Sequence, residues 1–272
     1  MCGIFGYTGF ARENRWGQTH RLLEALLLAS EHRGQDATGF AALTEPFKQP
    51  SKGKIVTDKQ PLTASKFLLR SGKWRGLRHR RSSIVIGHTR MTTTGTHWKN
   101  MNNHPHSSSD NRLHMVHNGV VSNHLEVARR RHLALRSECD SEIILALAAA
   151  ASHPTAGLHD AICELRGSIA TAILDAERGL LWLARNDDRP LWLLRLWDRR
   201  TFFASTKEIL VTAMQAVMGK SHREQIEMLI PMASNHVHGL GSSGELIAGD
   251  EIRPRAPLTF HRPRDTLALT RR

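Results

Sequence analysis

The sequence predicts an α+β protein in which two sheets share helices within one domain. Three observations lead to this prediction. The 272 residues, 40% hydrophobic and 23% charged, are enough to bury a sizeable core and exclude a wholly disordered chain. Strand-like segments come first along the chain, helical segments follow, and strand-like segments then return in quick succession. The chain has neither an internal repeat nor a clean linker, so we expect a single unit.

The first half of the chain alternates short apolar strands with amphipathic helices. Residues 1–8 predict a strand that begins almost at the chain start. Gln18 to Ser30 predicts a helix, because its leucines fall on one helical face. Pro61 predicts the start of a second helix, since proline fits a first helical turn, and Ser71-Gly72 interrupts that helix. Further strands are expected at 38–43, 54–57, 83–90 and 113–121.

Helices and then closely spaced strands fill the second half. We expect helices at 141–151, 157–165 and 206–218, and strands at 168–175, 180–186, 191–197, 202–205 and 244–252. Three tryptophans, Trp182, Trp192 and Trp197, stand beside leucines and are expected in the core or on a sheet face. The long polar stretch between Met91 and Arg112 is expected to be a functional or disordered loop.

The net charge of +13 is concentrated in two segments of the chain. Lys66 to Arg81 contributes +7 and Arg253 to Arg272 contributes +5. Such a balance favours acidic partners, nucleic acid above all, although basic runs are more often solvated faces. Trp182, Trp192 and Trp197 are not interleaved with these runs, so these three tryptophans are poor evidence for base stacking.

The composition also bears on the compartment. No run of about 18 apolar residues is present, and the N-terminus lacks a signal-peptide pattern, so we expect no membrane association. Three cysteines do not make a disulfide framework and suit a reducing cytoplasm. We therefore predict a cytoplasmic protein.

Cys2 is the residue with the sharpest chemical meaning. Removal of Met1 would leave a terminal cysteine that carries a nucleophilic sulfur and a free α-amine. That amine has a reference pKa of about 8, so it can serve as the base for its own thiol. A Met-Cys start means little by itself, and its meaning depends on the polar residues that follow it.

Several polar segments follow whose side chains suit the recognition of an amino acid amide. Arg90 ends an apolar strand and is suited to clamp a carboxylate. Asn118 and Gly119 can supply two N–H donors to an oxyanion. Asp140 precedes a helix and can bind an ammonium group, and Arg33 lies in a polar turn after the first helix.

These segments resemble the class II glutamine amidotransferases, which are N-terminal-nucleophile hydrolases. Their sequences are most similar to those of the glutaminase domains of glucosamine-6-phosphate synthase and amidophosphoribosyltransferase. The blocks that carry the resemblance appear in family order and run through roughly residues 2–210: Cys2-Gly3-Ile4, His32 to Gly39, Gly87 to Arg90, Asn103 to His106, His117-Asn118-Gly119 and Asp140-Ser141-Glu142.

The resemblance implies a fold and a reaction. The fold is a four-layer αββα sandwich, two antiparallel sheets between helices, over residues 2–252, with a basic C-terminal tail at 253–272. The reaction releases ammonia from L-glutamine through a γ-glutamyl thioester on the cysteine. We expect no cofactor, and we expect a separate ammonia-accepting synthase as partner, because no P-loop or phosphosugar motif follows the last recognisable block.

The resemblance also implies a role for each site residue. Cys2 matches the nucleophile, Asn118 and Gly119 the oxyanion hole, and Arg33 the residue that orients the chain terminus. Arg90 matches the clamp on the glutamine α-carboxylate with Thr93 as a helper, Asp140 the ligand of the α-amino group, and His104 the loop that closes over glutamine. Met91 and Thr94 depart from the family, which often has an aromatic residue and a histidine there.

Parts of the sequence also fit two other functions and a metal site. The same thioester chemistry fits a hydrolase of another γ-glutamyl amide. The charge fits a basic nucleic-acid-associated protein, or an amidotransferase that feeds nitrogen to a modified base. The pairs His104/His106 and His236/His238 have metal-ligand spacing, but no third ligand of suitable spacing accompanies either, so we predict no metal. Cys139 and Cys163 are expected to be ordinary buried thiols.

Overall fold

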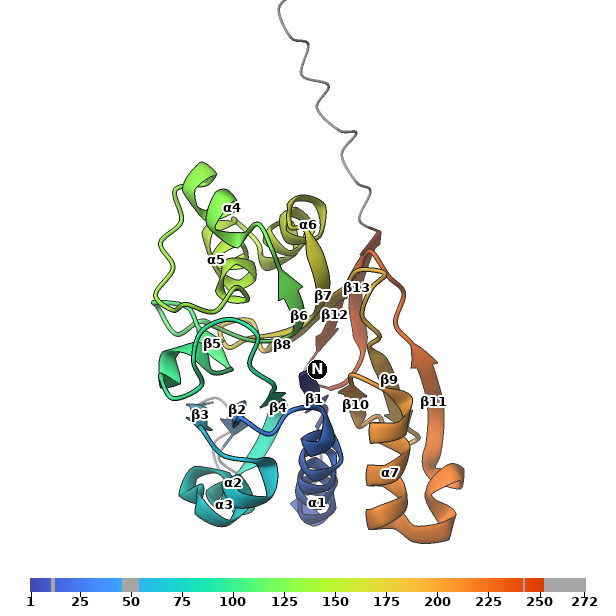
Figure 1. Ribbon diagram of the computed structural model, residues 1–272. Helices are drawn as coiled ribbons and strands as arrows, with labels where there is room; N and C mark the ends of the chain where they lie inside the picture. The colour runs from blue at the N-terminus through green and yellow to red at the C-terminus, as the bar shows by residue number, and fades with distance from the viewer. Residues whose placement is uncertain (11–12, 46–53, 242, 252–272) are drawn as a thin grey trace, which may run out of the picture.

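Two antiparallel sheets form the middle of the molecule, and helices cover their outer faces (Figure 1). The computed structural model describes residues 1–10, 13–45, 54–241 and 243–251. The predicted four-layer αββα arrangement is confirmed. The predicted tail, Arg253 to Arg272, lies outside the described residues, and the domain boundary at 252 stays a prediction.

The first sheet has seven strands in the order β11-β9-β10-β1-β4-β2-β3. The bounds are β1 Gly3–Thr8, β2 Ala37–Glu45, β3 Lys54–Gln60, β4 Arg81–Arg90, β9 Trp192–Leu196, β10 Thr201–Ala204 and β11 Ile226–Pro231. β1 pairs with β4 on one side, where Gly3 faces Thr89, and with β10 on the other, where Phe5 faces Ala204. The strand that begins one residue after Cys2 therefore lies in the interior of the sheet.

The second sheet has six strands in the order β13-β12-β8-β7-β6-β5. The bounds are β5 His106–Ser107, β6 Leu113–Val121, β7 Gly167–Asp175, β8 Leu180–Arg185, β12 His236–Gly241 and β13 Leu246–Glu251. Apolar side chains from both sheets pack between them, for example Ile4 and Ile86 from the first sheet and Val116 and Leu183 from the second. This shared core holds β1 and β6 in fixed positions relative to each other.

Helices form the two outer layers. They are α1 Glu13–Ser30, α2 Ala64–Arg70, α3 Gly72–Leu77 and α7 Lys207–Met218 against the first sheet, and α4 His124–Arg130, α5 Glu142–Ala150 and α6 Pro154–Glu164 against the second. Short 3₁₀ turns lie at Glu31–Arg33, Asn100–Asn102 and Gly219–Gln225. Within the described ranges, no helix combines the length and apolar character that a bilayer span requires.

The structure moves several predicted boundaries and adds elements. α6 starts at Pro154, three residues before the predicted start, because proline suits a first helical turn. The second helix starts at Ala64 rather than Pro61, where the Thr63 hydroxyl accepts a bond from the Lys66 amide at 3.5 Å. Strands β11 and β12 and helix α4 were not predicted. The expectation for Trp197 was wrong: its side chain is 66% exposed in the turn after β9.

Candidate active site

The structure places Cys2 directly before β1, between the chain start and the end of β4. Its Sγ lies 3.4 Å from both the backbone nitrogen and the backbone oxygen of Met91. Burial raises the pKa of the Cys2 thiol, and the hydrogen bond from the Met91 amide opposes that rise. With Met1 in place, the thiol is therefore a weak nucleophile at neutral pH.

Arg33 holds the backbone of Cys2. It lies at the end of the 3₁₀ turn after α1, is 9% exposed, and donates a hydrogen bond from Nε to the Cys2 carbonyl oxygen at 2.9 Å. This contact matches the orienting position that the resemblance implies for Arg33, and the role itself stays a prediction.

Arg90 ends β4 and is almost completely buried. Its Nη1 donates to Asn103 Oδ1 at 2.6 Å, and its Nη2 donates to the carbonyl oxygens of Thr94 and Gly95 at 2.6 and 2.8 Å. The guanidinium thus holds the loop between β4 and β5 in place. Thr93 lies exposed on that loop, and a substrate carboxylate at Arg90 would share the guanidinium with these acceptors.

Asp140 lies just before α5 and is 2% exposed. Its Oδ2 accepts a hydrogen bond from the Val121 amide at 2.6 Å, which ties the start of α5 to the end of β6. Both Arg90 and Asp140 act electrostatically on the Cys2 thiol, Arg90 lowering and Asp140 raising its pKa. The structure therefore gathers a nucleophile, a cation and an anion from three separate segments of the chain.

Asn118 and Gly119 occupy consecutive positions on β6. The side-chain amide nitrogen of Asn118, Nδ2, lies 3.4 Å from Ser205 Oγ. Ser205 Oγ in turn accepts a hydrogen bond from the backbone amide of Ile4 at 2.9 Å. Ser205 thus links the amide to β1, a connection that the sequence analysis did not identify. A Cβ at Gly119 would lie 1.8 Å from the Ser168 carbonyl oxygen, so only glycine fits against β7 there.

His104 points inward rather than into an open cleft. The residue is 3% exposed, and its ring stacks on His88 with the centroids 4.1 Å apart. Burial lowers the pKa of His104 well below the ordinary value, and burial with the nearby Arg90 lowers that of His88 to about 3. These imidazoles are neutral at physiological pH.

The structure also corrects the expectation that neither His pair has a third potential metal ligand. Cys139, brought in by the turn before α5, joins His104 and His106, and the three donor atoms all lie within 4.8 Å of one another. Cys139 is 33 residues beyond His106 in the chain, so no spacing rule connects them. Only the pairing of β5 with β6 and the packing of α5 bring them together.

Comparisons with known proteins identify the family of the chain. A family model described as a glutamine amidotransferase domain matches residues 88–212. A glutamine–fructose-6-phosphate aminotransferase (isomerizing) of Staphylococcus aureus is 32% identical over 71% of this chain and 30% of its own length. The protein of that name from Chlamydia pneumoniae is 33% identical over 75% of this chain and 32% of its own length. The chain thus spans less than a third of these curated relatives.

A solved structure shows the same fold over nearly the whole chain. Glutamine phosphoribosylpyrophosphate amidotransferase from B. subtilis, complexed with ADP and GMP, superposes with a TM-score of 0.68 over 93% of this chain and 49% of that one. Its identity to this chain is 19%, so it shows the fold alone.

The fold is that of the N-terminal-nucleophile hydrolases. Within them, the chain belongs to the class II glutamine amidotransferases, a class of enzymes, and it has a cysteine, Cys2, next to its start.

Proposed function

We propose that this chain hydrolyses L-glutamine to glutamate and ammonia through a γ-glutamyl thioester on Cys2. One observation carries the proposal: the Cys2 thiol, directly before the interior strand β1, lies 3.4 Å from the backbone of Met91, the residue after buried Arg90, and both Arg90 and Asp140 act electrostatically on the thiol. A buried cation and a buried anion beside one nucleophile suit the carboxylate and the ammonium group of an α-amino acid.

The reaction begins once Met1 has been removed. The α-amine of Cys2 takes the thiol proton, and Sγ attacks the side-chain amide carbon of glutamine. Asn118 and the Gly119 amide stabilise the oxyanion that forms. The carbon–nitrogen bond then breaks, the nitrogen takes up a proton, and ammonia leaves. Water attacks the thioester carbon, which releases glutamate and restores the thiol.

The test is ammonia release by the processed protein, whose loss of Met1 is checked by intact mass. Cys2→Ala is expected to abolish turnover, because no other residue supplies both the nucleophile and its base. Cys163→Ala, in α6, is the matched control and is expected to retain it. A glutamine-analogue alkylator should add one mass increment to the parent and none to Cys2→Ala.

Two outcomes would contradict the proposal. Turnover retained in Cys2→Ala would show that Cys2 is not the nucleophile. Faster turnover of larger γ-glutamyl amides than of glutamine would show that the protein is a hydrolase of those amides instead.

We further propose a separate enzyme as the acceptor of the ammonia. The support is the loop that follows Arg90, where three large apolar side chains are exposed: Met91 by 44%, Trp98 by 73% and Met101 by 59%. Exposed apolar side chains grouped beside a site favour a protein partner. Purification from the native host should retain a synthase, and Trp98→Ser should release it while free glutaminase activity persists. Activity that no retained protein alters would contradict the separate acceptor.

A further inference from the structure

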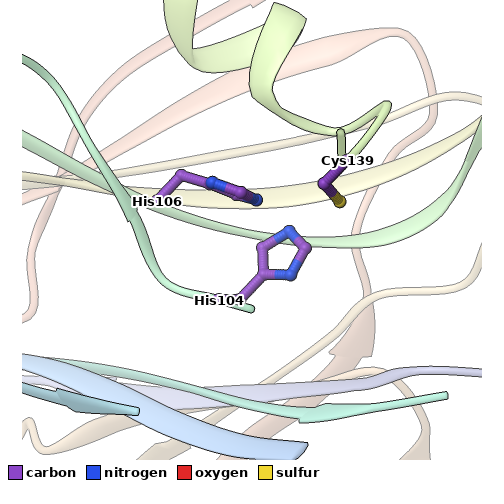
Figure 2. Close-up of side chains that lie close together, drawn as sticks. All are labelled: His104, His106 and Cys139. Atoms are coloured by element: carbon purple, nitrogen blue, oxygen red, sulfur yellow. The ribbon is translucent and has the colours of Figure 1, made fainter. Parts of the chain in front are cut away.

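A cluster of potential metal ligands lies beside the proposed glutamine site, and none of the bond-making steps proposed above uses these side chains. His104 and His106 come from the chain around β5, and Cys139 comes from the turn before α5 (Figure 2). Figure 2 shows the two imidazoles and the sulfur turned toward one another. All three residues are buried, at 3% exposure each.

The imidazoles in this cluster have polar atoms without partners. Among the residues that the structure describes, neither ring nitrogen of His104 has a hydrogen-bond partner, and neither has Nε2 of His106. A buried polar atom without a hydrogen-bond partner destabilises the folded state, so each such atom needs an explanation. A bound group that accepts nitrogen lone pairs would explain these unpartnered nitrogens.

We propose that His104, His106 and Cys139 bind one divalent transition-metal ion, with Zn²⁺ the best match. Two imidazole nitrogens and one thiolate are the borderline-soft donors that zinc prefers, and three protein ligands leave a fourth position for water. On binding, the Cys139 S–H bond breaks, the sulfur–metal bond forms and the proton goes to solvent. No electron is transferred.

The geometry requires a small contraction of the cluster. Zinc bonds of about 2.0–2.3 Å at tetrahedral angles place neighbouring donors about 3.4–3.6 Å apart. The donor atoms here lie within 4.8 Å, so ring and thiol rotations can close the remaining distance. The backbone is already fixed, because Lys59 Nζ donates to the carbonyl oxygens of Asn103 and Pro105, on either side of His104, at 2.7 and 3.0 Å.

Access and local charge are compatible with an ion. His106 lines a cavity of about 180 Å³ whose other lining residues are Lys59, Met101, Ser107, Arg136, Ser137 and Glu142. Lys59, Arg90 and Arg136 are cations near His106 that oppose metal binding. Asp140 and Glu142, one and three residues beyond Cys139, offset them. Burial raises the pKa of the Cys139 thiol, so Cys139 adds a negative charge only when it loses its proton to the metal.

Bound metal would join the two sides of the proposed glutamine site. His104 follows Asn103, which accepts a hydrogen bond from Arg90, and Cys139 precedes Asp140. An ion shared by His104 and Cys139 ties the loop to the start of α5, so we expect it to raise the thermal stability of the protein.

The experiment uses the full chain with Cys2→Ala, which leaves Cys139 and Cys163 as its cysteines. The chelator-treated protein is titrated with Co²⁺, a spectroscopic substitute for zinc, and then with Zn²⁺. We expect one ion per chain, a thiolate-to-cobalt charge-transfer band with tetrahedral d–d bands, and a higher melting temperature. Cys139→Ser should lose the charge-transfer band, and His106→Asn should weaken binding more than tenfold.

The chain offers a matched control in its second pair, His236 and His238, whose rings stack 5.9 Å apart on β12. In the described part of the chain that pair has no third donor, so His238→Asn should bind metal like the parent. The proposal fails if the parent binds no stoichiometric ion or if the charge-transfer band survives in Cys139→Ser. Since no step requires turnover, its failure is separable from that of the glutaminase proposal.

Discussion

Asn103 connects the position of Arg90 with the stability of the fold. Its Oδ1 accepts from Arg90 at 2.6 Å, and its Nδ2 donates to the His97 carbonyl oxygen at 2.7 Å. The residue is completely buried, so removal of its amide leaves a buried guanidinium short of one acceptor.

Asn103→Leu, which keeps the approximate volume, is therefore expected to lower the free energy of unfolding by about 1.5–3 kcal/mol. It should also raise the KM for glutamine more than it lowers kcat, because Arg90 is the proposed carboxylate ligand. Urea unfolding and steady-state kinetics measure the two effects. Asn14→Ala, on the exposed side of α1, is the control, and equal losses in the two variants would contradict this view of Asn103.

At the scale of residues, sequence reasoning found the polar groups of the site but not how they contact one another. Cys2, Arg33, Arg90 and Asp140 could be named because each stands in a recognisable block. The sequence predicts Cys139 to be a buried thiol, which it is, but does not predict its place beside the histidines, since only the sheet pairing and the packing of α5 bring it there. Long-range contacts of this kind leave no local pattern in the sequence.

Two helical glycines differ in the space that surrounds them. Gly17 is exposed in α1, and a Cβ there would meet nothing within 4 Å. Gly157 lies in α6 against α5, where a Cβ would lie 2.4 Å from Ala148 Cα and from the Leu147 carbonyl oxygen. Gly157 thus sets how closely the two helices approach.

Gly17→Ala is expected to raise the free energy of unfolding by about 0.5–1 kcal/mol, because alanine has the higher helix propensity. Gly157→Ala is expected to lower it by about 1–3 kcal/mol, because the helices must separate. Chemical denaturation of both variants in parallel checks the two signs. A stabilised Gly157→Ala would mean that α5 and α6 pack less closely than described here.

At the scale of elements, strands with strong apolar patterns were predicted and partner-dependent strands were not. β4 and β7 carry long apolar runs and appear close to their predicted bounds. β11 ends on a proline, and β12 contains two histidines and two glycines, so the strand pattern of each is interrupted. Each forms because a neighbour, β9 or β8, supplies the hydrogen-bonding edge.

Buried neutral histidines make the whole molecule sensitive to acid. His117 on β6 is an example: burial lowers its pKa to about 4, with Asp140 and the Ser168 carbonyl acting against that shift and Arg189 adding to it. A histidine whose pKa is lower in the folded state binds fewer protons than in the unfolded state. The contribution of His117 to the free energy of unfolding is therefore fully present above pH 6.5 and is lost as the pH falls toward 4.

For His117 alone, the expected loss is about 2 kcal/mol between pH 7.5 and pH 5. Urea unfolding at the two pH values, with chelator present, measures it. His117→Gln should show a smaller difference between the two pH values, whereas His79→Asn, at an exposed position after α3, should behave like the parent. An unchanged pH dependence in His117→Gln would assign the acid sensitivity to other groups.

The interior position of β1 has a consequence for how the protein is made. Its partner β10 begins at Thr201, so about 200 residues must leave the ribosome before β1 can be enclosed on both sides. At typical synthesis rates this takes about 10–40 s. Throughout that interval the nascent terminus is open to an aminopeptidase. Met1 is still 60% exposed once the sheet has formed, because it lies outside β1, so the terminus also remains open after folding. Enclosure of β1 therefore does not by itself limit the fraction of chains that lose Met1.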